Sequence, residues 1–79
     1  MSFAQKVSMR SELLWLVKAI DDGEACWYYL LLEKPKLELF KARIKTDTAK
    51  LTDYGKILYS GWGEVPPADI QQKIKEQFG

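Results

Sequence analysis

The sequence contains no histidine and a single cysteine, Cys26, among its 79 residues. Without histidine the chain lacks the commonest general base, every Ser-His or Cys-His dyad, and imidazole metal ligands. One cysteine cannot form an internal disulfide, and a zinc site needs several Cys or His ligands. A Gly-rich phosphate loop and a dinucleotide-binding fingerprint are also missing. We therefore expect a protein that is not an enzyme and that binds no metal or cofactor.

Long apolar segments are also missing. The longest uncharged, mainly apolar run covers 25–32, which is far shorter than the ~20 residues of a membrane-spanning helix. Residues 1–10 lack the apolar segment of a signal peptide. Together with the single cysteine, these features predict a cytoplasmic protein without a membrane partner.

Neither sign of charge is in clear excess, because 12 basic and 11 acidic side chains leave a net charge of +1. A dedicated duplex-binding protein usually carries a basic excess. The segment 34–56 nevertheless gathers basic residues, which predict a solvated helix face or a local positive surface. They are Lys34, Lys36, Lys41, Arg43, Lys45, Lys50 and Lys56. The acidic cluster of Asp21, Asp22 and Glu24 is interpreted as a solvated turn rather than a calcium loop.

Two apolar runs flank Asp22-Gly23, a dipeptide favoured in tight hairpin turns. Taking these two residues as the loop pairs Ala19 with Cys26 and continues outward to Leu13 and Leu32, all on one apolar face. That face predicts a buried, structural thiol for Cys26. A helix that begins at Ser11 is the alternative, but a surface helix would leave Leu14 partly exposed. The hairpin is therefore favoured.

Further elements follow along the chain. Pro35 suits the first turn of a helix with an apolar stripe of Leu37, Phe40 and Ile44. Residues 46–55 are expected to form a polar connection. The pattern of 56–62 predicts a strand with Ile57 and Tyr59 on one side and Leu58 and Trp62 on the other. After Pro66-Pro67, a last helix carries Ile70, Ile74 and Phe78. Residues 1–10 fit either a short helix or a flexible lead-in.

These elements predict one α+β domain over 1–79, with the order β-β-α-β-α. A three-stranded, largely antiparallel sheet would have both helices packed on one face.

The other face of the predicted hairpin is the first candidate interaction site. It carries Leu14, Leu16, Trp27, Tyr29 and Leu31, with Lys18 opposite Trp27. An apolar patch of this size needs an explanation. The last helix or residues 1–10 could cover it, a second copy could pack on it, or single-stranded nucleic acid could stack on its aromatic rings.

The second candidate site is the aromatic segment 54–64, with Tyr54, Tyr59, Trp62 and Glu64. Glycines on both sides of Trp62 could present its indole to a partner. Small domains need large side chains to complete their cores, so the sequence favours a Trp62 that folds back against the core.

We therefore expect a small intracellular interaction domain, a homodimer that uses the aromatic sheet face or the segment 54–64. A single-stranded nucleic-acid module that uses Trp27, Tyr29 and the basic segment 34–56 is the alternative. An enzyme with an unusual site at Asp53, Tyr59 or Glu64 is the least favoured class.

Overall fold

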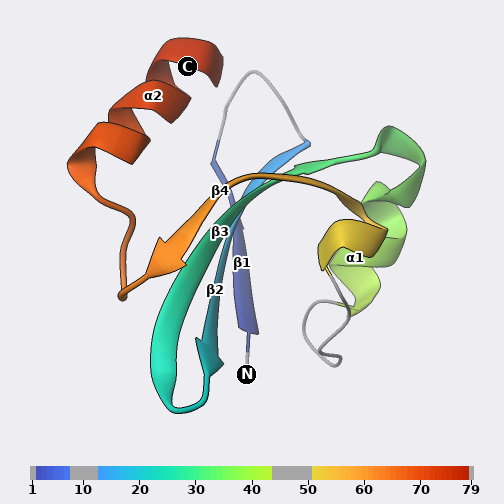
Figure 1. Cartoon of the computed structure of the whole chain (residues 1–79). Coiled ribbons are helices and arrows are strands. Elements are labelled where there is room, and N and C mark those ends of the chain that lie inside the picture. Colours follow the sequence, from blue (N-terminus) through green and yellow to red (C-terminus); the bar gives the residue numbers. More distant parts are fainter. Residues whose placement is uncertain (1, 8–12, 44–50, 79) are drawn as a thin grey trace.

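The computed structural model describes residues 2–7, 13–43 and 51–78 (Figure 1). Within these ranges four antiparallel strands form one sheet in the order β1-β2-β3-β4. The strands are β1 (Ser2–Lys6), β2 (Leu14–Asp21), β3 (Glu24–Leu32) and β4 (Gly55–Trp62). The α-helices are α1 (Leu37–Arg43) and α2 (Ala68–Phe78), with short 3-10 helices η1 (Lys34–Lys36) and η2 (Leu51–Asp53). The α+β class and the antiparallel sheet are confirmed.

The sheet has one strand more than the sequence indicated. β1 forms in the segment for which a short helix or a flexible lead-in was expected. It pairs with β2, with Ala4 opposite Val17, and the Val7 N–H donates to the Leu14 carbonyl oxygen at 3.1 Å. A five-residue strand has no clear period of its own, so its conformation depends on the neighbouring strand with which it pairs.

The predicted hairpin and its register are confirmed. Asp22 and Gly23 have φ values of 51° and 79°, as a tight turn with two left-handed residues requires. Ala19 lies opposite Cys26, and the pairing continues to Leu14 opposite Leu31. The helical alternative for this segment is therefore wrong, although Ser11, its expected first residue, lies outside the described residues.

The two helices pack on opposite faces of the sheet, which corrects the expectation that both cover one face (Figure 1). On the α1 face, Val17 and Leu30 pack with Phe40 of α1. On the α2 face, Leu14 and Trp27 pack with Ile74 of α2. Both faces of the β2–β3 hairpin are apolar, so each requires its own cover.

Aromatic edge-to-face contacts complete the core on the α1 face. The Phe40 ring lies 5.4 Å from Trp15 and 5.6 Å from Tyr54, measured between ring centroids. Leu37 and Phe40 are buried as the predicted stripe requires, whereas Ile44 lies outside the described residues. The Glu33 N–H donates to the Tyr54 carbonyl oxygen at 2.8 Å, which joins the end of β3 to the turn before β4.

A bulge in β4 changes the predicted sides of this strand. Tyr59 pairs with Tyr29 while Ile57 pairs with Leu30, so Leu58 is the extra residue. Ile57 therefore packs on the α1 face, and both Leu58 and Tyr59 pack on the α2 face. The expectation that Ile57 and Tyr59 share a side is wrong, because strict alternation fails where a strand has an extra residue.

α2 begins after Pro66-Pro67, as predicted, and covers the sheet through Ile70, Ile74 and Phe78. The Gln71 side-chain amide donates to the Pro66 carbonyl oxygen at 2.7 Å, and this bond ties the helix to the preceding linker. No helix in the described part of the chain combines the length and apolar character needed to cross a membrane.

Candidate functional site

The turn end of the β2–β3 hairpin extends beyond both helices (Figure 1). The reason is that the strands of the hairpin are longer than the helices that pack on them. A helix of seven residues such as α1 is about 10 Å long, whereas a strand of eight residues such as β2 is about 26 Å long. The α1 face therefore has a covered end near α1 and an end near the turn on which no described helix packs.

We call this second end of the α1 face the open step, and define it by five residues. Strand pairing places Cys26 between Ala19 of β2 and Trp62 of β4, and Tyr28 beside Ser60 of β4. Directly opposite residues in antiparallel strands point to the same side of the sheet. The open step is therefore formed by Ala19, Cys26, Tyr28, Ser60 and Trp62.

Trp62 is the largest exposed residue of the open step and is 63% exposed. It is the last residue of β4, and the following Gly63 has a φ of +117°. The Gly63 N–H donates to the Ala25 carbonyl oxygen at 2.9 Å, so the backbone beside Trp62 is fixed to β3. The expectation that Trp62 folds back to complete the core is wrong, because Trp62 is 63% exposed and belongs to neither core cluster.

Cys26 is buried at the open step, and Tyr28 lies where the open step meets the core of the α1 face, against which it packs. The thiol is 4% exposed and lies 3.6 Å from both the Ala19 carbonyl oxygen and the Tyr28 hydroxyl oxygen. This confirms the prediction that Cys26 is buried. The hydrogen bond with Cys26 raises the pKa of Tyr28, and burial together with the negative charge of Asp21 raises it further. A tyrosine hydroxyl can both donate and accept hydrogen bonds, so Tyr28 adds a polar group beside the apolar surface of the open step.

The rim of the open step is acidic. Asp21, Asp22 and Glu24 are exposed at the hairpin turn, and Glu64 is exposed just beyond Trp62. Lys18 is the one basic residue of the adjoining hairpin segment 18–25. The apolar surface of the open step is thus bordered by four carboxylates, whereas Lys18 lies opposite Trp27 on the α2 face.

The first candidate site from the sequence lies beneath α2. Trp27 and Tyr29 are each 3% exposed, and their ring centroids are 5.9 Å apart. Lys18 and Leu31 are half-buried on the same face. The last helix therefore covers this face, which was one of the three explanations that the sequence offered for the apolar patch. In this conformation neither aromatic ring is accessible to a partner protein or to a nucleic-acid base.

The structure divides the second candidate site, the segment 54–64. Tyr54 is buried against Phe40, whereas Tyr59 is half-buried on the α2 face with the Lys73 ammonium 6.0 Å from its ring centroid. Trp62 and Glu64 are exposed. Asp53 and Glu64 lie at opposite ends of β4, so the three residues named for an enzyme are not brought together.

The basic residues of the segment 34–56 are distributed over several elements. Lys36 lies 3.0 Å from a Glu33 carboxylate oxygen and donates to the Asp53 carbonyl oxygen at 2.7 Å, and Lys41 lies 3.7 Å from Glu38. Lys34, Arg43 and Lys56 are exposed, and Lys45 and Lys50 lie outside the described residues. Among the described residues, no group of three or more Cys, Asp or Glu side chains could hold a metal ion.

The sequence placed this whole face of the hairpin in the core, whereas Ala19 and Tyr28 are half-buried, and of these two only Tyr28 packs against the core of the α1 face. The lengths of the elements could have revealed them. Strands of eight and nine residues are too long for one short helix to cover along their whole length.

Comparison of the chain with family models, curated proteins and solved structures found no match. Function is therefore inferred from the geometry of the open step.

Proposed function

We propose that this chain is a small protein-interaction domain that self-associates through the open step. One observation carries the proposal: Trp62, the last residue of β4, is 63% exposed and belongs to neither of the two core clusters that pack against the helices. Large exposed apolar surfaces are uncommon in monomers and often mark contact sites. Tryptophan and tyrosine are among the residues that most often dominate the binding energy of an interface.

The supporting strands make the open step a rigid surface. Trp62 is opposite Cys26, and Tyr28 is opposite Ser60, so both aromatic residues project from paired backbone. Rigid aromatic side chains lose little conformational entropy on binding. The half-buried Tyr28 adds a phenolic donor beside the apolar surface of Trp62.

Sedimentation over a wide range of protein concentrations tests the proposal. We expect the mass to rise from one chain to two, and we expect Trp62→Ala to weaken this association by roughly 30-fold or more, as loss of a central aromatic residue does. Ile20→Ala is the matched control, because Ile20 is also 63% exposed but lies on the α2 face. A chain that stays monomeric at millimolar concentration would contradict the proposal.

A further inference from the structure

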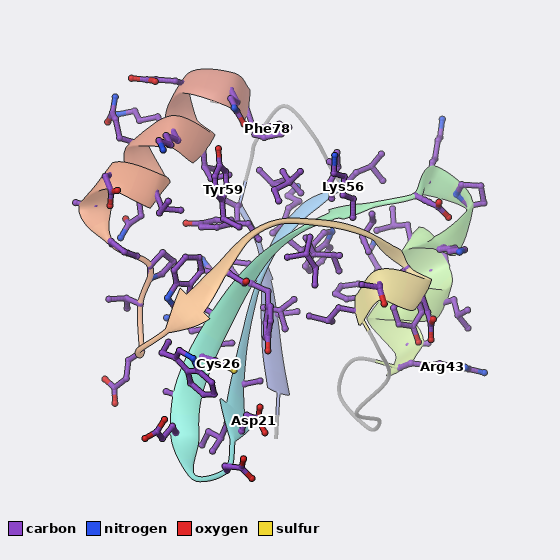
Figure 2. The ribbon with its side chains drawn as sticks, in the orientation of Figure 1. Asp21, Cys26, Arg43, Lys56, Tyr59 and Phe78 are labelled. Carbon is purple, nitrogen blue, oxygen red and sulfur yellow. The ribbon has the colours of Figure 1, made fainter. Side chains whose placement is uncertain are left out.

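The outer side of α1 has an apolar and basic character that complements the open step. Leu39 is 45% exposed and Arg43 is exposed. Residues four apart lie on the same side of a helix, so these two side chains form one flank. Figure 2 shows Arg43 at the end of α1, pointing away from the sheet. This flank therefore presents an apolar side chain and a cation to a neighbouring molecule.

The two ends of the α1 face also carry opposite charge. Lys34, Lys36, Lys41 and Arg43 outnumber Glu33 and Glu38 along η1 and α1. At the open step, the four exposed charged residues of the rim, Asp21, Asp22, Glu24 and Glu64, are all acidic. Glu33 pairs with Lys36, and Glu38 pairs with Lys41. Glu38 is the one acidic residue of α1, so Arg43 has no second carboxylate within its own helix with which to pair.

From this arrangement we infer that a second copy of the chain occupies the open step, with α1 of each copy lying over the open step of the other. The inference rests on the proposed self-association and specifies its geometry. A two-fold axis between the copies brings Leu39 of one onto Trp62 of the other. The same rotation brings Arg43 of one to Asp21 and Glu24 of the other, and the contact is made twice.

This arrangement uses the whole α1 face. A stable interface of standard size buries about 800 Å² of each partner, which is about one seventh of the 5624 Å² that this chain exposes. In a two-fold dimer each copy contributes both its helix flank and its open step, so both apolar surfaces count toward that area. Opposite charges at the rim favour this two-fold arrangement and disfavour a parallel arrangement of the two copies.

A charge exchange tests the geometry. In a homodimer of the Asp21→Lys variant, a lysine faces Arg43 of the other copy. In a homodimer of the Arg43→Glu variant, a glutamate faces Asp21 of the other copy. Each variant alone should therefore dimerise at least tenfold more weakly than the unaltered chain. In an equimolar mixture the heterodimer should form at least tenfold more tightly than either variant forms a homodimer, because each of its two contacts then joins opposite charges at positions 21 and 43. Sedimentation measures all three samples, with one variant fluorescently labelled to identify the heterodimer.

Lys75→Glu and Glu76→Lys on α2 are the matched controls, since they change the net charge by the same amounts on exposed positions of another element. Each should dimerise like the unaltered chain, and their mixture should show no preference for a heterodimer. Circular dichroism confirms that every variant is folded. Dimers that withstand Asp21→Lys and Arg43→Glu but are weakened by Trp62→Ala would overturn this geometry and leave self-association standing. A monomeric unaltered chain would overturn both.

Discussion

The Trp27 ring lies directly against the backbone of Gly61 on the neighbouring strand. A Cβ atom added at Gly61 would fall 2.7 Å from Cζ2 of Trp27, which is closer than carbon atoms approach in folded proteins. Trp27 is opposite Gly61 in the sheet and is 3% exposed, so its ring is enclosed between the sheet and its neighbours on the α2 face. Glycine at this position therefore allows the largest side chain of the α2 face to pack.

Gly61→Ala should destabilise the fold. Forcing an extra methyl group into a packed core typically costs about 1–3 kcal/mol, and chemical denaturation measures the loss. Ser60→Ala is the control, because Ser60 is exposed on the same strand and should change the free energy of unfolding by less than about 0.5 kcal/mol. Equal stability of the two variants would show that the Trp27 ring can shift.

Attachment of α2 to the sheet depends on few side chains. Ile74 is the one residue of this helix that is fully buried, and Ile70 and Phe78 are partly buried beside it. Ile74→Ala should cost about 2–5 kcal/mol if the whole fold responds. The cost will be smaller if α2 separates from the sheet while the rest of the protein stays folded.

Hydrogen exchange distinguishes these two responses. Local separation should accelerate exchange of the amides of α2, 68–78, and leave β2 and β3 protected. It should also make Trp27 accessible to a collisional quencher. Gln72→Ala, an exposed position of the same helix, should leave both measurements unchanged. Uniform acceleration across the sheet would show that α2 cannot open independently.

The hairpin was predictable in full because its signal is local. Asp22-Gly23 determines the turn, and a two-residue loop determines every pair from Asp21 and Glu24 outward. The last helix was predictable for a similar reason, since Pro66-Pro67 precedes it and one apolar side chain recurs at every fourth position.

Features that depend on contacts between distant segments were not predictable in this way. β1 is extended because β2 offers an edge with which it pairs. The bulge at Leu58 depends on how β4 meets β3, and nothing in the local pattern of 55–62 marks it. The two candidate sites could not be ranked from the sequence for the same reason: α2 covers Trp27, whereas Trp62 is 63% exposed and belongs to neither core cluster.

Stability should fall at alkaline pH because two tyrosines are held in their neutral form. Burial raises the pKa of Tyr29, and the hydrogen bond with Cys26 is the largest cause of the raised pKa of Tyr28. In the unfolded chain both phenols ionise near pH 10. Above that pH the unfolded state binds fewer protons than the native state, so the free energy of unfolding decreases as pH rises. Below it, the contribution of both groups is fully present.

Tyr29→Phe isolates one of these groups. The free energy of unfolding of the unaltered chain, minus that of the variant, should be constant from pH 7 to about pH 9 and should decrease as pH rises beyond 10. Denaturant titrations at each pH measure this difference, and it cancels the contributions of lysines and of Cys26 that both proteins share. A difference that stays constant through pH 11 would show that Tyr29 ionises as readily in the native protein as in the unfolded chain. That result would be incompatible with a phenol enclosed between Trp27 and α2.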